Sequence, residues 1–249
     1  MKIDVVGNGC TWTDELCTSF VINDEMLVDV PQGSFKTLLH KYNVKNIKYI
    51  VVTHFHSDHF ADIHLVLNYI FRKMPEQKVT IVAPKGAYKR ISDLFRLLEG
   101  PHYIEYMNQR TTFIDAENNK RIKLGSYNFK CFKMTHGKLD AYGYVIDDGE
   151  VKVGFTGDTC MCNNVRKIVK ASKECFIDSA NIFEDSKHLC VHEVYLLMQE
   201  FPTCKLHPVH IINSSKQQLL DMGIEFPKQG ETIFVENEKW FLWKSGGEI

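Results

Sequence analysis

The sequence predicts a single mixed α/β domain that spans residues 1–249. Short runs rich in β-branched residues alternate with segments of helical periodicity along the whole chain. No linker, repeat or low-complexity tract divides the chain, and its length is within the range of one large α/β domain. With 44% apolar and 24% charged residues, the chain has the composition of an ordinary globular protein with a sizeable core, which excludes disorder.

The first half of the chain reads as short strands separated by turns and by three helices. The predicted strands are residues 3–6, 19–22, 26–30, 49–52 and 79–83, and the predicted helices are residues 34–42, 62–71 and 84–98. Pro84-Lys85-Gly86 opens the last helix, and Glu99-Gly100-Pro101 ends it. Residues 102–119 have no clear period; a connecting hairpin is favoured over a lid or a subunit contact.

The second half returns to strands, with helices between them. Two strands around Gly125-Ser126 occupy residues 122–132, and Asp147-Asp148-Gly149 is typical of a hairpin turn. The remaining predicted strands are residues 144–146, 151–155, 174–177, 232–235 and 240–243, and the predicted helices are residues 164–171 and 191–200.

The segment most informative about chemistry is Thr53-His54-Phe55-His56-Ser57-Asp58-His59, which directly follows the buried strand at residues 49–52. Functional residues are commonly placed on loops that leave a rigid sheet. His54 and His56 project to the same side of an extended segment, while Asp58 and His59 can turn toward a second ion. The spacing indicates a two-metal hydrolytic centre rather than a solvated polar turn.

The His-x-His-x-Asp-His string behind a hydrophobic strand resembles the signature of the metallo-β-lactamase fold superfamily. The resemblance implies a four-layer αββα sandwich with a two-metal site at one edge and three further ligands in sequence order. His136, upstream of Tyr142-Gly143-Tyr144, matches the third motif, and Asp158, in Thr156-Gly157-Asp158-Thr159, matches the fourth. For the last ligand, His210, at a strand end before an expected loop at Asn213-Ser214-Ser215, is favoured over His207 in mid-strand.

The implied ligands are divided between two divalent ions. One ion is assigned His54, His56 and His136, the other Asp58, His59 and His210, and Asp158 is shared. Because nitrogen ligands favour zinc while carboxylates admit manganese, the expected cofactors are two Zn²⁺ or Mn²⁺ ions. A thiolate from Cys160 or Cys162 is a less favoured ligand, since the set is complete without it.

The N-terminal third is similar to the opening of the RNase Z group of tRNA 3′-processing endonucleases. The similarity is carried by Val5-Val6-Gly7-Asn8-Gly9, Cys17-Thr18-Ser19-Phe20-Val21 and Leu27-Val28-Asp29-Val30-Pro31-Gln32-Gly33. Further on, residues 176–180 stand where that group has His-Glu-Ala-Thr, and His188 stands where it has a histidine that contacts the scissile phosphate. The resemblance implies that Asp58 and His188 are catalytic: Asp58 orients the nucleophile, and His188 contacts a phosphate oxygen or protonates the leaving oxygen.

Two features depart from the RNase Z pattern. Leu189-Cys190 replaces the Ser or Thr that follows the phosphate-contacting histidine, so the alternative for His188 is a capping or surface residue on the helix that leads to Glu200. His136 and Asp158 are only 22 residues apart, which leaves no room for the tRNA-gripping arm of RNase Z. In length and in this truncated middle, the chain looks like the compact anti-Pycsar phosphodiesterases of phages, which cleave cyclic mononucleotides to defeat antiviral signalling.

The expected substrate is therefore a small nucleotide, in particular a 3′,5′-cyclic mononucleotide. A net charge of −1 gives no general electrostatic reason to bind a long nucleic acid. The alternatives are an RNase Z-like tRNA 3′-endonuclease, a hydrolase of a carboxylic ester, thioester or lactam, and a protein that sequesters a nucleotide without cleaving it.

Location and assembly follow from weaker signals. The sequence shows no secretory signal and no apolar stretch long enough for a membrane span, which predicts a cytoplasmic protein, in the host cytoplasm if a phage encodes it. Eight scattered cysteines without a Cys-x-x-Cys pair indicate reduced thiols. The resemblance also implies a homodimer.

Overall fold

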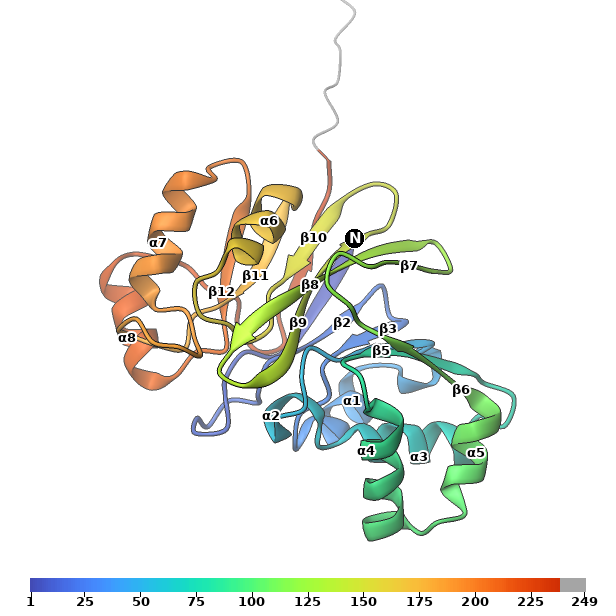
Figure 1. The fold of residues 1–249 in the computed structure, drawn as a ribbon. Helices are drawn as coiled ribbons and strands as arrows, with labels where there is room; N and C mark the ends of the chain where they lie inside the picture. The colour runs from blue at the N-terminus through green and yellow to red at the C-terminus, as the bar shows by residue number, and fades with distance from the viewer. Residues whose placement is uncertain (238–249) are drawn as a thin grey trace, which may run out of the picture.

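Two β-sheets lie face to face in the computed structural model, which describes residues 1–237 (Figure 1). The first sheet contains, in spatial order, β13 (Thr232–Phe234), β1 (Lys2–Gly7), β2 (Ser19–Ile22), β3 (Met26–Val28), β4 (Tyr49–Val51), β5 (Val79–Ala83) and β6 (Thr111–Asp115). The second contains β12 (Lys205–Val209), β11 (Glu174–Asp178), β10 (Lys152–Phe155), β9 (Leu139–Asp147), β8 (Tyr127–His136) and β7 (Arg121–Leu124).

Helices cover the outer face of each sheet. On the first sheet lie α1 (Ser34–Lys41), α3 (Ile63–Lys73), α4 (Ala87–Leu94) and α5 (Tyr103–Arg110). On the second lie α6 (Asn163–Ala171) and α7 (Val191–Glu200), and α8 (Asn213–Asp221) packs against α7. Figure 1 shows these two helical groups on opposite sides of the paired sheets. The predicted four-layer αββα fold is therefore confirmed.

The hydrophobic core between the sheets reaches directly behind the metal motif. β4 lies between parallel neighbours and is buried on both faces, which explains why its sequence is continuously apolar rather than alternating. Phe20 of β2 packs against Phe155 of β10 and Phe176 of β11, with ring centroids 5.2 and 4.7 Å away. This aromatic cluster joins the two sheets next to the strand ends that carry the candidate ligands.

The strand directions bring those ends to one edge of the sandwich. β10, β11 and β12 are parallel, and β8 and β10 are both antiparallel to β9, so these four strands run the same way. His136 ends β8, Asp158 follows β10, Asp178 ends β11 and His210 follows β12. In the facing sheet, His54 follows β4. Residues up to 156 positions apart in the chain thus meet at a single edge.

Three predicted elements need correction or lie outside the described residues. The hairpin expected within residues 102–119 is wrong, because Tyr103 and Met107 are buried against the helical layer and form α5, which leads into β6. Asn213-Ser214-Ser215 starts α8 instead of a loop, since the Ser215 hydroxyl and the backbone of Ile212 are hydrogen bonded to each other. The strand expected at residues 240–243 lies outside the described residues.

The other helix bounds agree closely with expectation. α4 continues as a π-helical turn (Phe95–Glu99), so the helical segment stops where Glu99-Gly100-Pro101 predicts. A short helix, α2 (Ser57–Phe60), and a 3₁₀ turn (Val44–Asn46) complete the elements of residues 1–237. Over the described part of the chain, every helix is too short or too polar to cross a lipid bilayer.

Candidate metal centre

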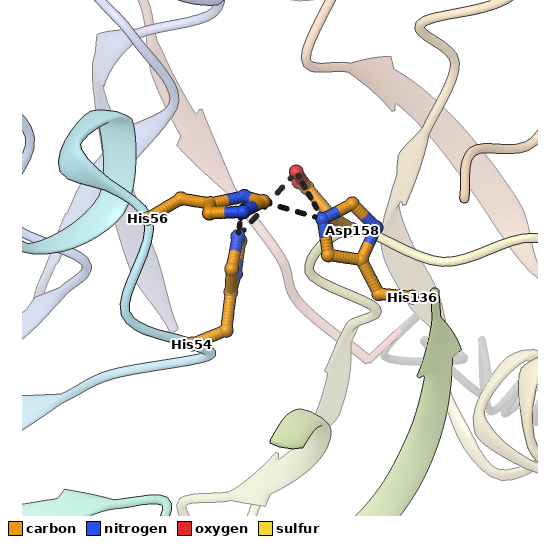
Figure 2. A group of neighbouring side chains, drawn as sticks. All are labelled: His54, His56, His136 and Asp158. Carbon is orange, nitrogen blue, oxygen red and sulfur yellow. Dashed lines mark hydrogen bonds and ion pairs between the residues drawn. The ribbon is translucent and has the colours of Figure 1, made fainter. Parts of the chain in front are cut away.

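Four of the predicted ligands form a first group at this edge: His54, His56, His136 and Asp158, with ligand atoms within 4.8 Å of one another (Figure 2). Nε2 of His54 and Nε2 of His136 lie 3.1 and 3.3 Å from Nδ1 of His56. Oδ2 of Asp158 is 3.6 Å from Nε2 of His54 and 3.8 Å from Nε2 of His136. Three nitrogen atoms and one oxygen atom therefore surround one point.

A second group contains Asp58, His59 and His210 and shares Asp158 with the first. Nε2 of His210 lies 3.4 Å from Oδ2 of Asp58 and 3.6 Å from Oδ2 of Asp158. Oδ1 of Asp158 lies 3.2 Å from Nε2 of His59. Asp158 thus directs one oxygen toward His59 and the other toward both groups, as a carboxylate that bridges two ions would.

The hydrogen bonding of these side chains fits the binding of divalent cations. Nδ1 of His136 donates to the carbonyl oxygen of Lys187 at 2.8 Å, so Nε2 presents a lone pair to the other ligands. Nε2 of His54 and Nε2 of His136 both lie within 3.3 Å of Nδ1 of His56. Because Nδ1 of His56 carries at most one hydrogen, hydrogen bonds among these three rings cannot satisfy all of their nitrogen atoms. Within residues 1–237, Nε2 of His59 and Oδ1 of Asp158 are buried and lack a hydrogen-bond partner of good geometry. A cation between these atoms would satisfy them.

The local backbone explains how so short a motif serves both groups. His54 and His56 lie in the loop between β4 and α2, and His56 has an extended backbone with φ −67° and ψ 154°. Helix α2 begins directly after it at Ser57 and carries Asp58 and His59, which belong to the second group. His210 has a positive φ of 58°, and its backbone N–H donates to Oγ1 of Thr18 at 3.0 Å. This hydrogen bond holds an otherwise strained residue in place after β12.

Asp29, in the segment Leu27-Val28-Asp29-Val30, supports the candidate centre and was not predicted from the sequence. Its Oδ2 accepts from Nδ1 of His59 at 2.7 Å, and its two oxygens accept from the backbone N–H and Oγ1 of Thr53 at 2.7 and 2.8 Å. Asp29 therefore fixes both the ring orientation of His59 and the start of the metal motif. The sequence offered one sign of this role: Asp29 is an acidic residue between the apolar residues Val28 and Val30, where a carboxylate would be buried and need hydrogen-bond partners.

Asp178 is a second missed residue, and it places His188. Oδ2 of Asp178 lies 2.9 Å from Nδ1 of His188, and Oδ1 lies 3.7 Å from Nδ1 of His210. Nδ1 of His188 is in turn 3.9 Å from Oδ2 of Asp158. His188 lies in the loop before α7 rather than on the helix, so the structure places it beside the candidate ligands instead of on the surface of that helix.

Burial and neighbouring charges set opposite protonation tendencies within the cluster. Burial lowers the pKa of His59, but the carboxylates of Asp158 and Asp29 outweigh this effect and raise it well above its usual range. Burial, together with the charge of His59, lowers the pKa of His54 well below its usual range. Without a cation, the charged form of His59 and the neutral form of His54 are favoured, and a metal ion bound through His59 would compete with its proton.

His188 also has a raised pKa. Burial acts to lower it, but the hydrogen bond and the negative charge of Asp178 dominate. The protonated form of His188 is thereby favoured next to the candidate centre, as a proton donor requires.

The less favoured ligands of the sequence analysis belong to no ligand group found in residues 1–237. Nε2 of His207 lies 2.5 Å from Oε2 of Glu174, and its ring stacks on Phe176. Cys160 and Cys162 are half-buried free thiols outside the groups described above. His210, in contrast, belongs to the second group, with Nε2 3.4 Å from Oδ2 of Asp58.

Comparison with protein families and curated proteins gives consistent relatives. Residues 27–211 match the family described as "Beta-lactamase superfamily domain". Ribonuclease Z of Clostridium kluyveri is 25% identical over 154 residues, which cover 58% of this chain and 49% of that protein. Ribonuclease Z of Pyrococcus horikoshii is 20% identical over 215 residues, or 85% of this chain and 64% of that protein. The chain thus spans about half to two thirds of the length of these relatives.

Solved structures show the same fold at low sequence identity. The short form of human tRNase Z superposes with a TM-score of 0.74 at 17% identity, covering 95% of this chain and 100% of that one. A diphosphatase of the PhnP family superposes with a TM-score of 0.73 at 17% identity, covering 94% of this chain and 98% of that one.

Proposed function

Since the chain belongs to the β-lactamase superfamily domain family, we propose that it is a metal-dependent hydrolase related to RNase Z, and specifically a two-metal phosphodiesterase of small nucleotides. Its proposed reaction opens a 3′,5′-cyclic mononucleotide, such as cCMP, cUMP, cAMP or cGMP, to the nucleoside 5′-monophosphate. The biological role that fits is the removal of a cyclic-nucleotide antiviral signal.

The compact connection between His136 and Asp158 carries the proposal. β8 turns directly into β9 at residues 137–138, and β9 turns into β10 at residues 148–151, with strand pairing along the whole segment. No arm that could grip a tRNA lies between these strands, as the spacing of His136 and Asp158 predicts. A substrate small enough to fit at the strand ends needs no such arm.

The residues at the centre suit attack on a phosphodiester. Two divalent ions held by the candidate ligands would supply an activated water and positive charge for the phosphate oxygens. Asp58, which lies on the far side of His210 from Asp178, would orient the attacking group. His188, whose ring is hydrogen bonded to Asp178 and whose protonated form is favoured, would donate a proton to the departing 3′ oxygen.

The comparisons support a phosphorus-containing substrate. Both curated relatives are named ribonuclease Z, and the two superposed structures are named tRNase Z and diphosphatase. These names span RNA and smaller phosphate substrates, so they favour phosphoryl chemistry over carbonyl chemistry without selecting the nucleotide.

The test is hydrolysis of 3′,5′-cyclic mononucleotides, cyclic dinucleotides and pre-tRNA by protein loaded with zinc or with manganese. We expect nucleoside 5′-monophosphates from the cyclic mononucleotides, and no product from Asp58→Ala. We expect His188→Gln to lower kcat about 10²- to 10⁴-fold while metal content stays unchanged. His192→Gln is the matched control, since His192 is an exposed histidine on α7 and its loss should leave kcat unaltered.

A tRNA 3′-endonuclease is the second candidate, and the two ribonuclease Z relatives favour it. Trimming of pre-tRNA without cleavage of cyclic mononucleotides would replace the first proposal with this one. Cleavage of a thioester or lactam alone would point to carbonyl chemistry, and recovery of tightly bound, intact nucleotide would point to a sequestering protein. The expected homodimer is tested by sedimentation of the same sample.

A further inference from the structure

Two aromatic side chains are almost fully exposed in the described part of the chain. Trp12 is 86% exposed and Phe183 is 76% exposed, more than any other aromatic residue among residues 1–237. A single exposed aromatic residue is unremarkable in a globular protein. The positions of these two residues are informative because both lie on loops anchored at the candidate metal centre.

Trp12 lies on the loop between β1 and β2, whose two stems contact the residues after β12. Oγ1 of Thr18 accepts from the backbone N–H of His210, and the carbonyl oxygen of Asn8 accepts from the N–H of Ile211, each at 3.0 Å. The base of the Trp12 loop is therefore fixed to a candidate ligand of the second group.

The Trp12 loop is also internally braced. Its ends are joined by hydrogen bonds from Gly9 to Leu16 at 2.9 Å and from Thr18 to Gly9 at 3.0 Å. Oγ1 of Thr13 is hydrogen bonded to both the N–H and the carbonyl oxygen of Cys10. The same hydroxyl packs against Gly9, where an added Cβ would lie only 2.2 Å from it. Trp12 is thus presented to solvent by an ordered loop, which lowers the entropy cost of binding a ligand.

Phe183 lies on the segment before α7, which borders the first group. The carbonyl oxygen of Lys187 accepts from His136, and the carbonyl oxygen of Ser186 accepts from the N–H of Gly137 at 3.2 Å. The same segment carries His188 beside Asp178. One exposed aromatic side chain therefore lies on each of two loops, one anchored beside His210 and the other beside His136.

The charges on the two loops disfavour a polyanion as their ligand. The Trp12 loop carries Asp14 and Glu15, and the Phe183 loop carries Glu184 and Asp185. Against these four carboxylates stand Lys187 and His188, whose protonated form is favoured, and Lys216 of α8, which pairs with Glu15. A nucleic-acid backbone would be repelled by this set. A neutral, flat group such as a nucleobase can stack on an indole without meeting these charges.

On the basis of the proposed function, we propose that Trp12 is the stacking platform for the nucleobase of the substrate and that Phe183 forms the opposite wall. The metal centre then binds the phosphate, and the two exposed aromatic side chains bind the base. Stacking tolerates any base, so the site would accept purine and pyrimidine nucleotides alike.

The binding test does not depend on turnover. In a Trp240→Phe/Trp243→Phe background, Trp12 is the single tryptophan, and its fluorescence is followed while AMP, CMP or ribose 5-phosphate is added to metal-loaded protein. We expect saturable quenching by AMP and CMP and none by ribose 5-phosphate. By calorimetry with AMP, Trp12→Ala in the natural background should weaken binding roughly 5- to 100-fold. Phe234→Ala is the matched control, since Phe234 is an exposed aromatic residue paired with the opposite end of β1.

A kinetic test separates this inference from the proposed function. Trp12→Ala should raise KM for a cyclic nucleotide and leave the constants for the base-free 3′,5′-cyclic phosphate of 1-O-methylribose unchanged. If the parent protein cleaves neither substrate but AMP still quenches Trp12, the proposed reaction fails and the base site stands. Equal losses on both substrates, unchanged AMP binding, or conversion of a dimer to a monomer by Trp12→Ala would each overturn the inference.

Discussion

At the scale of single residues, the candidate ligands owe their orientation to groups that would not themselves bind the ions. His59 is oriented by Asp29, His136 by the carbonyl oxygen of Lys187, and His210 by the hydroxyl of Thr18 through its backbone. Such partners fix the tautomer and the direction of a ligand, so their loss weakens a metal site although the ligands remain.

Asp29 provides the sharpest residue-scale prediction. Asp29→Asn preserves the size of the side chain, and Asn also tolerates the positive φ of 57° at this position. The substitution removes the negative charge of the carboxylate that accepts a hydrogen bond from His59. We expect metal affinity to fall about 10- to 100-fold, measured by competition with a chromophoric chelator.

The matched control for Asp29→Asn is Asp24→Asn, because Asp24 also has a positive φ, of 60°, but is exposed and pairs with Lys2. An equal loss of affinity in both variants, or in neither, would show that Asp29 does not position His59.

At the scale of elements, the connection after β10 depends on a glycine. Gly157 has a φ of 57°, and a Cβ there would lie 2.7 Å from Cβ of Thr53. The backbone of Gly157 therefore packs directly against the side chain of Thr53 at the start of the metal motif. This close contact places the next residue, Asp158, between the two ligand groups.

We expect Gly157→Ala to displace Asp158 and to lower both metal content and the free energy of unfolding, the latter by about 2 kcal/mol. Gly223→Ala is the control, since its φ of 66° imposes the same backbone strain but no atom lies within 4 Å of the added methyl group. Metal analysis and urea unfolding would check both variants; full metal content in Gly157→Ala would contradict the prediction.

Helix α5 is joined to the end of α3 by hydrogen bonds from its last residue, Arg110. Its guanidinium donates to the carbonyl oxygens of Phe71, at 3.0 Å, and Gln77, at 3.1 Å, and also to that of Met74. These acceptors lie at the end of α3 and just beyond it, where carbonyl groups lack intrahelical partners.

Replacing Arg110 by Met should destabilise the protein by about 3 kcal/mol, because buried carbonyl groups lose charged donors. For a chain of this size, that corresponds to a fall in Tm of roughly 6–12 °C in calorimetry. Arg96→Met, which removes an exposed arginine of the neighbouring π-helical turn, should leave Tm nearly unchanged. Equal Tm values for the two variants would refute this role of Arg110.

At the scale of the whole molecule, the candidate ligand side chains of the two sheets meet at one edge of the sandwich. Without a cation, some of these side chains repel one another and others lack hydrogen-bond partners. The candidate ligands come from both sheets, so cations bound there would also link the sheets. At a free metal concentration about 100 times Kd, binding adds about 2.7 kcal/mol to the free energy of unfolding.

Removal of metal with a chelator should therefore lower Tm by roughly 5–10 °C, reversibly on addition of zinc or manganese. Calorimetry of Asp158→Ala is the control, since the chelator should not shift the Tm of a variant without the shared ligand. A chelator-independent Tm of the parent protein would contradict metal binding at this site.

The eight thiols report on the integrity of the whole fold. All eight are free; six are buried, while Cys160 and Cys162 are half-buried. Burial raises the pKa of Cys131 to about 11 and that of Cys204 to about 12, so these groups stay protonated and unreactive at pH 8. A chromogenic thiol reagent should label two thiols quickly in native protein and all eight in denaturant. Rapid labelling of more than two would show that the core is less closed than the structure indicates.

The sequence by itself determined the features that depend on neighbouring residues. Apolar runs and their periods predicted most strands and helices, and the dense His54–His59 motif identified the chemistry because four ligands lie within six positions. His136, Asp158 and His210 could be named only through resemblance, since a lone histidine or Gly-Asp pair carries no local signal.

Only the tertiary structure decided the features that depend on contacts between distant segments. Residues 103–110 form a helix because the layer formed by α3 and α4 buries Tyr103 and Met107, and Asp29, Asp178 and Thr18 gain their roles from partners 30, 10 and 192 positions away. The physical reason is that burial and hydrogen bonding are set by whatever lies next to a side chain in space, and the parallel strand ends of two sheets bring together residues that no pattern along the chain relates.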